Sequence, residues 1–298
     1  MPQSQQENIV SVAYSNLGKS VDSWGYNLVT RINGTQEYTS TYTDLKLINR
    51  HFTQNIIKYL PQNIGNKLVR FADFGGADGF LARSIIHQLF KINLNYEGLV
   101  VDKELISGKT KQAFDEYILQ NPKASDKLVA IAGDFTNPTE INIKPDSLSF
   151  ATMRNVLQYC GKDKSQILNS VSQYLSQNAI LITQTPICNK ENQVNINSFW
   201  AEHAQIMQGL DIETSLNSHY FPTLEEIEMY GTQAGFEVLE SYLATDMPFK
   251  VSVENMTNGS RFKTPTGVQK DQIEDIFQKH FNSDHYFHIP GVVVFRKV

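Results

Sequence analysis

The chain has 298 residues, of which 41% are hydrophobic and 19% charged, and its formal net charge is −5. This composition is typical of a globular protein with a sizeable core, and the lack of a cluster of Lys and Arg argues against a nucleic-acid partner. No apolar run reaches the roughly 20 residues that span a bilayer, no secretory signal is visible, and Cys160 and Cys188 lack metal-ligand spacing. We therefore expect a cytoplasmic protein with no membrane partner and no bound metal.

Residues 1–67 are polar, with scattered aromatic residues, and are predicted to form a helical N-terminal cap. One helix is indicated by apolar residues that recur every three or four positions until Pro61, namely Leu45, Ile48, Phe52, Ile56 and Leu60. Tyr14 and Tyr26 of the cap are candidates for substrate binding. The alternative is that the aromatic residues of the cap only pack against one another.

From Leu68 onward, short apolar runs alternate with amphipathic segments. The first five runs predict strands at about 68–74, 96–101, 128–133, 147–153 and 179–184. Two more strands, beginning at Phe236 and Gly291, close the pattern without a further crossover of the earlier kind. We expect an α/β domain over 68–298, with a seven-stranded, mostly parallel, Rossmann-like sheet and helices on both faces. Insertions at about 186–221 and 247–289 are predicted to form lids.

Residues 68–79 join a predicted strand to a helix through an acid and a glycine-rich turn. Gly75, Gly76 and Gly79 let the backbone turn sharply and let a ligand approach without meeting a Cβ atom. Asp73, at the end of the strand, is placed to accept hydrogen bonds from a cationic group. Such a turn holds one end of a nucleotide-like ligand, although an ordinary βα turn with incidental glycines is the alternative.

Polar residues also stand at the ends of the next three predicted strands. Asp102 follows the glycine turn by about 20 residues, where a carboxylate can accept both ribose hydroxyls. Asp134 precedes Phe135, a pair suited to an exocyclic amine and a purine ring. Arg154 ends the fourth strand at the edge of the expected crevice. A solvated acid and a turn-capping acid are the alternatives for Asp102 and Asp134, but acids at three successive strand ends form a coherent set.

With these motifs, residues 68–298 resemble the class I S-adenosylmethionine-dependent methyltransferases. In that family the glycine turn contacts the methionine part of the cofactor, the acid after the second strand binds its ribose, and the acid after the third binds its adenine amine. The resemblance implies S-adenosylmethionine as cofactor, S-adenosylhomocysteine as product, and cofactor binding by Asp73, Gly75, Gly76, Gly79, Asp102, Asp134, Phe135 and Arg154. One departure is Ala77, where many members have glycine and related sequences tolerate alanine.

The chain is also similar to small-molecule O-methyltransferases of the caffeate and polyketide type, which share a Gly-Gly turn and an Arg-Asn-Val-Leu-His-Asp-Trp-like segment. Here that segment reads Arg154-Asn-Val-Leu-Gln158-Tyr-Cys160. The resemblance puts a histidine base at the position of Gln158, and glutamine cannot accept a proton at neutral pH. Gln158 therefore stays a catalytic-site candidate without the role of a base. Only 67 residues precede the first strand, so we do not carry over the dimerisation domain of that subfamily and expect a monomer or a homodimer.

The histidines supply other candidates for the acceptor side. His219 is the best candidate base, because it lies just before a predicted helix at the end of the first insertion; a surface histidine near a helix start is the alternative. His203 shares the apolar stripe of its predicted helix and is a candidate substrate contact, packed or partly buried. His285 and His288 flank aromatic residues near the last strand and are further candidates for lining a pocket.

The expected activity is O-methylation of a small molecule, a secondary metabolite in natural product biosynthesis. The alternatives are N- or C-methylation, including methylation of a peptide terminus, and a cofactor-binding protein without transfer activity. A dinucleotide-dependent dehydrogenase is a third alternative, against which Asp134 and the closing pair of strands count.

Overall fold

The computed structural model describes residues 38–60, 67–92, 94–106, 108–120, 127–137, 139–245, 249–253, 256 and 265–298. Its α-helices are α3 (Tyr38–Tyr59), α4 (Phe80–Lys91), α5 (Gly108–Gln120), α7 (Ser165–Tyr174), α8 (Gln193–Gln208), α9 (Ile212–Ser218), α10 (Leu224–Gln233) and α12 (Gly267–Phe281). Its strands are β1 (Val69–Phe74), β2 (Tyr96–Asp102), β3 (Leu128–Ala132), β4 (Leu148–Arg154), β5 (Leu175–Ile187), β6 (Phe236–Leu243), β7 (Phe249–Ser252) and β8 (His285–Lys297). Short 3-10 helices follow β2 and β4, namely η1 (Lys103–Ile106) and η2 (Leu157–Tyr159).

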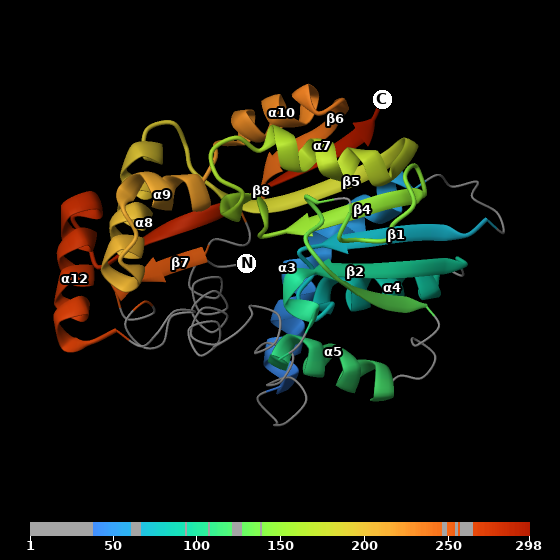
Figure 1. Ribbon diagram of the computed structural model, residues 1–298, viewed down its shortest axis with the longest axis horizontal. Coiled ribbons are helices and arrows are strands. Elements are labelled where there is room, and N and C mark those ends of the chain that lie inside the picture. The colour runs from blue at the N-terminus through green and yellow to red at the C-terminus, as the bar shows by residue number, and fades with distance from the viewer. Residues whose placement is uncertain are drawn as a thin grey trace.

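The strands form one mixed sheet in the order β3-β2-β1-β4-β5-β8-β6, and β7 pairs with β8 beyond this path (Figure 1). β1 to β5 run parallel to one another, whereas β8 runs antiparallel between β5 and β6. The strand order reverses direction at β1, which makes the carboxyl ends of β1 and β4 a topological switch point where α/β proteins bind ligands. The predicted α/β fold is confirmed.

Helices cover both faces of this sheet, as the alternating pattern predicts (Figure 1). On one face, α3 and α4 pack on the sheet through Phe52, Ile56, Leu81 and Ile85, all of which are buried. On the other face, α7 and α10 pack through residues that include Leu168. α3 therefore belongs to the same core as the sheet. Whether residues 1–67 form a separate cap stays a prediction, because residues 1–37 lie outside the described residues. Tyr14 and Tyr26, the candidate substrate contacts, are among them.

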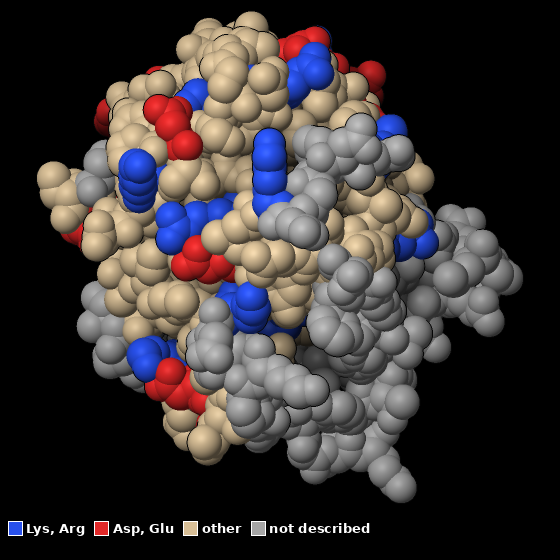
Figure 2. Space-filling view, turned by 90° about the vertical axis from the view of Figure 1, so that its right-hand side faces the viewer, with Lys and Arg blue, Asp and Glu red and all other residues tan. Residues whose placement is uncertain are grey.

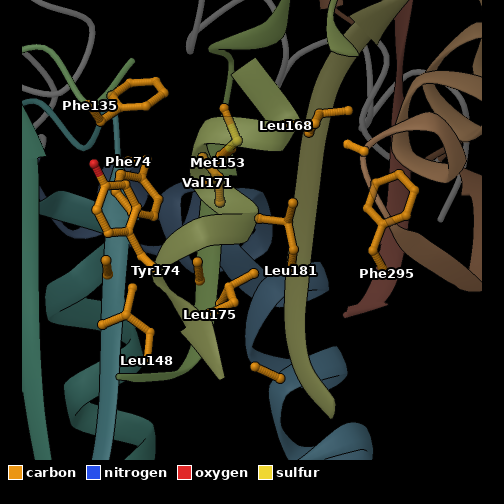
Figure 3. Close-up of a cluster of buried hydrophobic side chains, with 14 of the residues drawn as sticks. Phe74, Phe135, Leu148, Met153, Leu168, Val171, Tyr174, Leu175, Leu181 and Phe295 are labelled. Carbon is orange, nitrogen blue, oxygen red and sulfur yellow. The ribbon is translucent and has the colours of Figure 1, made fainter. Parts of the chain in front are cut away.

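The core beneath α7 shows how the sheet is anchored next to the glycine turn (Figure 3). Phe74, the last residue of β1, is fully buried, and its ring lies 5.8 Å from the ring of Tyr174 in α7. The ring of Phe135 lies 5.2 Å from that of Phe74 on the other side. Because these large side chains interlock, the carboxyl end of β1 is held in a close-packed environment.

A group of helices lies beyond the carboxyl ends of the parallel strands (Figure 1). α8, α9 and α12 lie there with β7. Apolar side chains of α8, α12 and β7 form a separate cluster with Tyr286 of β8, around Phe199 and Phe277. α12 begins with a capping box between Thr266 and Gln269, which satisfies the first free amides of the helix. These elements fall within the predicted insertions at about 186–221 and 247–289, and their role as lids stays a prediction.

The predicted number and limits of the strands are wrong in two places. The sheet has eight strands instead of seven, because residues 249–252 form β7, which is too short for its apolar pattern to stand out in the sequence. β8 starts at His285 instead of Gly291, inside the second predicted insertion, and its first residues pair with β7. His285 and His288 therefore lie on a strand.

The opposite end of the molecule, where the parallel strands begin, carries charges of both signs (Figure 2). Ion pairs at these strand ends join Arg70 to Glu97 and Lys297 to Asp146. The described part of this face shows acidic and basic side chains side by side, unlike the single-sign surface that binds a phosphate backbone. Among the described helices, none has both the length and the apolar character needed to cross a bilayer.

Candidate active site at the carboxyl ends of the strands

Asp73 is buried at the end of β1 with one oxygen in use. Its side chain is 1% exposed, and its Oδ1 accepts a 2.8 Å hydrogen bond from the hydroxyl of Thr152 on β4. Its Oδ2 is also buried and has no hydrogen-bond partner within the described part of the chain. Burial raises the pKa of this carboxyl to about 7, although the Thr152 bond and the charge of Arg154 act in the opposite direction. The sequence did not single out Thr152.

The glycine turn is fastened to the end of β2. The amide of Gly75 donates to the carbonyl of Val101 at 2.8 Å, and the amide of Ala77 donates to Oδ2 of Asp102 at 2.9 Å. Ala77 has a φ of 47°, in the left-handed region that favours glycine. Glycine, which the resemblance to methyltransferases puts at this position, would adopt this conformation without strain.

Gly76 is required for a different reason, which is close packing. A Cβ atom added there would lie 2.8 Å from Oδ2 of Asp73, 2.9 Å from the Asp73 carbonyl oxygen and 2.9 Å from Cγ1 of Val100. Real Cβ atoms essentially never come so close to such neighbours. The bare backbone of Gly76 is therefore what allows the turn to lie directly over Asp73.

Asp134 and Phe135 follow the end of β3 and differ in their surroundings. Oδ1 of Asp134 accepts hydrogen bonds from the amide and the hydroxyl of Thr136 at 2.9 and 2.7 Å, so the acid caps its own turn. Phe135 is only 8% exposed, and its ring packs on Phe74 in the core, where Figure 3 shows it. The ring therefore offers little surface for a purine, while Asp134 stays at the edge of the sheet beside the other strand ends.

Arg154 connects three elements of the site. Its Nη1 donates to Oδ1 of Asn49 on α3 at 2.9 Å, and Nδ2 of Asn49 donates to the hydroxyl of Ser84 on α4 at 2.9 Å. Burial lowers the pKa of Arg154, and the charges of Asp73 and Asp78 oppose that effect. The arginine thus brings a positive charge next to two buried acids at the switch point.

The loop after β4 is bound to the segment between α9 and α10. The carbonyl of Gln158 accepts a 2.9 Å hydrogen bond from the amide of Tyr220, and Oε1 of Gln158 accepts a 2.7 Å bond from the hydroxyl of Thr185. Lys164 is fully buried, and its Nζ donates to the carbonyl of Gly161 and, at 3.1 Å, to that of Tyr220. Burial lowers the pKa of Lys164 to about 8. No local pattern in the sequence predicts these contacts of Gln158 and Lys164.

The same contacts bring His219 next to Gln158, and His203 interacts with His219. The ring of His219 meets the ring of Tyr159 edge-on, with 4.7 Å between the ring centroids. His203 on α8 is 1% exposed; burial lowers its pKa to about 4, with a contribution from the charge of His219. Gln158, His203 and His219 therefore lie in one region, beside the carboxyl end of β4. His285, by contrast, is at the start of β8, hydrogen-bonded to Asp284 at 2.6 Å.

Similarity to known structures decides which fold this site belongs to. No protein-family model and no curated protein sequence matches the chain. A candidate methyltransferase from Bacillus halodurans is 10% identical with a TM-score of 0.57, and the match covers 82% of this chain and 98% of that one. Geranyl diphosphate C-methyltransferase from Streptomyces coelicolor, solved with S-adenosyl-L-homocysteine, is 12% identical with a TM-score of 0.52, covering 100% and 99%.

The chain has the fold of the class I S-adenosylmethionine-dependent methyltransferases. A candidate O-methyltransferase from Nostoc punctiforme also shares this fold, at 14% identity and a TM-score of 0.51, with 99% of this chain and 69% of that one covered. In this fold, Asp73, Asp102 and Arg154 lie at the switch point of the sheet, where α/β folds bind ligands.

His288 adds a buried hydrogen-bond chain to the helical part of this methyltransferase fold. Nε1 of Trp200 donates to the Tyr286 hydroxyl at 2.6 Å, that hydroxyl is 3.0 Å from Nε2 of His288, and Nδ1 of His288 is 3.4 Å from the carbonyl of Ile187. The carbonyl can only accept, so Nδ1 carries the proton and Nε2 accepts from the tyrosine. His288 is thus held neutral, and burial lowers its pKa to about 4.

We predict that His288 makes the fold sensitive to acid. Its pKa rises from about 4 in the folded chain to about 6.5 on unfolding, so the unfolded state binds more protons between these values. The free energy of unfolding should therefore fall as the pH drops from 6.5 to 4, by up to about 3 kcal/mol from this residue. Urea unfolding of wild type and His288→Gln at both pH values checks this, because the variant should lose less stability. Parallel losses in the two proteins would contradict the assignment.

Proposed function

We propose that the protein transfers a methyl group from S-adenosylmethionine to a small molecule and releases S-adenosylhomocysteine. The observation that carries this proposal is the buried Oδ2 of Asp73, which has no partner among the described residues and lies beneath a glycine turn at the switch point of a methyltransferase fold. A buried carboxylate oxygen without a partner is costly, and a cationic amine satisfies it.

The other residues at this edge fit the remaining parts of the cofactor. Asp102 at the end of β2 would bind the ribose, and Asp134 at the end of β3 would bind the adenine amine. Arg154, Gly75 and Gly79 would border the methionine part. Contact of Phe135 with the cofactor remains a prediction. Because its ring is buried, Asp134 is the stronger candidate for binding the adenine at the end of β3.

S-adenosylmethionine supplies an activated methyl group on a positively charged sulfur, so the protein mainly has to align the acceptor and exclude water. For a hydroxyl acceptor, His219 would take the proton as the oxygen forms its new bond to the methyl carbon. Gln158 and His203 would contact the same acceptor, since they lie beside His219. The segment from α8 to α10 would shield this region. An oxygen of a secondary metabolite is the acceptor that we favour.

C-methylation is a second candidate, for two reasons. A C-methyltransferase shares the fold along its whole length, and this chain has Gln158 where similar O-methyltransferases have a histidine. Incubation of a cell extract with the protein and trideuteromethyl-labelled S-adenosylmethionine, followed by mass spectrometry, separates the candidates by the position of the label. Failure to label any compound would instead favour a protein that binds the cofactor without transferring its methyl group.

Replacing Asp102 tests the donor site directly. We expect Asp102→Ala to weaken the binding of S-adenosylhomocysteine by roughly tenfold, or about 1.4 kcal/mol, because it removes the ribose acceptor and the bond to the Ala77 amide. Calorimetric titration measures the change. Glu97→Ala is the control, since Glu97 lies on the same strand but pairs with Arg70 at the other end. Equal affinities of wild type and Asp102→Ala would remove Asp102 from the site.

A further inference from the structure

Gln184 is a buried polar residue that the proposed donor site does not use. It lies near the end of β5 and is 1% exposed. Its register partner on β4 is Arg154, the last residue of that strand, and its carbonyl accepts a 2.8 Å hydrogen bond from the amide of Asn155. Gln184 is therefore level with the switch point, and its side chain shares a sheet face with that of Arg154 because paired residues of neighbouring strands point the same way.

The side-chain amide of Gln184 makes no hydrogen bond through either its oxygen or its nitrogen within the described part of the chain. Both atoms, Oε1 and Nε2, are buried. At the same level of the sheet, Arg154 donates to Asn49 on α3. The hydroxyl of Tyr242, two strands from β5, is bonded to Asn55 at 2.9 Å. A buried amide with neither donor nor acceptor satisfied destabilises the fold. A ligand that completes these hydrogen bonds would remove that cost.

The position of β5 in the sheet separates this residue from the donor. Asp134, Asp102 and Asp73 stand at or next to the carboxyl ends of β3, β2 and β1. These strands are consecutive in the sheet, so a donor bound by the three acids lies over that half. β4 and then β5 follow on the other side of β1, and neighbouring strands are about 4.8 Å apart. Gln184 therefore lies two strands from Asp73, on the side opposite to Asp102 and Asp134. A donor bound by the three acids would not cover this part of the sheet edge, at the ends of β4 and β5.

We propose that Gln184 binds the methyl acceptor, with Nε2 donating to and Oε1 accepting from a neutral polar group such as a hydroxyl. A hydroxyl both donates and accepts, so it satisfies both atoms of the amide. A carboxylate would pair with Nε2 but face Oε1 with a second acceptor. The inference rests on the proposed function and narrows its substrate class to neutral, hydroxyl-bearing small molecules.

The test uses Gln184→Met, which keeps the length of the side chain and removes both polar atoms. We expect this variant to have a higher melting temperature and to bind S-adenosylhomocysteine within about twofold of wild type. Transfer of the labelled methyl group to the acceptor found in a cell extract should fall at least tenfold, mainly through a higher KM for that acceptor. Gln173→Met, at an exposed position of α7, is the control and should leave the melting temperature, S-adenosylhomocysteine binding and methyl transfer unchanged. Should Gln184→Met fail to fold, Gln184→Asn keeps both atoms but withdraws them by one methylene, and the same rise in KM is expected.

Two results would overturn the inference. Unchanged transfer in the variants would show that Gln184 does not contact the acceptor. A loss of S-adenosylhomocysteine binding of tenfold or more would assign Gln184 to the donor site. These results can be distinguished from failure of the proposed function itself. In that case the wild-type protein would bind no S-adenosylhomocysteine.

Discussion

Gly76→Ala should lower the affinity for S-adenosylhomocysteine by roughly a hundredfold, which corresponds to about 2.7 kcal/mol. The new methyl group would meet both the carboxylate and the backbone carbonyl of Asp73, at 2.8 and 2.9 Å. Backbone atoms cannot rotate away as a side chain can, so the turn and Asp73 must move apart. We expect the free energy of unfolding to fall as well, by about 1–3 kcal/mol. Calorimetry and urea unfolding measure the two effects.

Gly267→Ala is the matched control for this prediction. Gly267 is the first residue of α12, and a Cβ atom added there would meet nothing within 4 Å. This substitution should leave cofactor binding unchanged and should not destabilise the helix, in which alanine is preferred over glycine. If Gly76→Ala binds S-adenosylhomocysteine as tightly as Gly267→Ala does, the glycine turn does not contact the cofactor.

His219→Ala should lower the turnover of a hydroxyl acceptor by about a hundredfold, the lower end of what a general base contributes. Cofactor affinity should stay the same, because His219 lies against Tyr159, beyond β4, and not at the ends of β1 to β3. The measurement is the rate of label transfer to the acceptor at saturating S-adenosylmethionine. His285→Ala, at the start of β8, serves as the histidine control.

The outcome also distinguishes the types of methylation. Unaltered turnover in His219→Ala would remove this residue from the mechanism. It would then favour an acceptor that needs no base on the enzyme, such as a carboxylate that is already ionised.

The placement of the acids at the ends of β1, β2 and β3 could be predicted from the sequence because its signals are local. A buried strand, an acid and a glycine turn are consecutive in the chain, and Asp102 and Asp134 follow at the ends of the next strands. In a parallel sheet these ends must meet at one edge, so alternating apolar runs are enough to bring the acids together. The structure adds that Asp102 and Asp134 also organise their own turns.

The acceptor side depends on contacts between segments that are far apart in the chain. Lys164 gives no periodic signal, yet it is fully buried because two backbone carbonyls, one of them from Tyr220, surround its amine. Gln184 reads as one polar residue near the end of an apolar strand, and only three-dimensional packing shows that its amide is buried without partners among the described residues. Burial of this kind results from tertiary structure, which local patterns do not encode.

The central claim, that this fold binds a methyl donor at the glycine turn, is tested most directly by titrating the wild-type protein with S-adenosylhomocysteine in a calorimeter. We expect saturable binding with one molecule per chain, and no comparable binding of a nicotinamide dinucleotide. Binding of the dinucleotide alone, or no binding of S-adenosylhomocysteine, would contradict it.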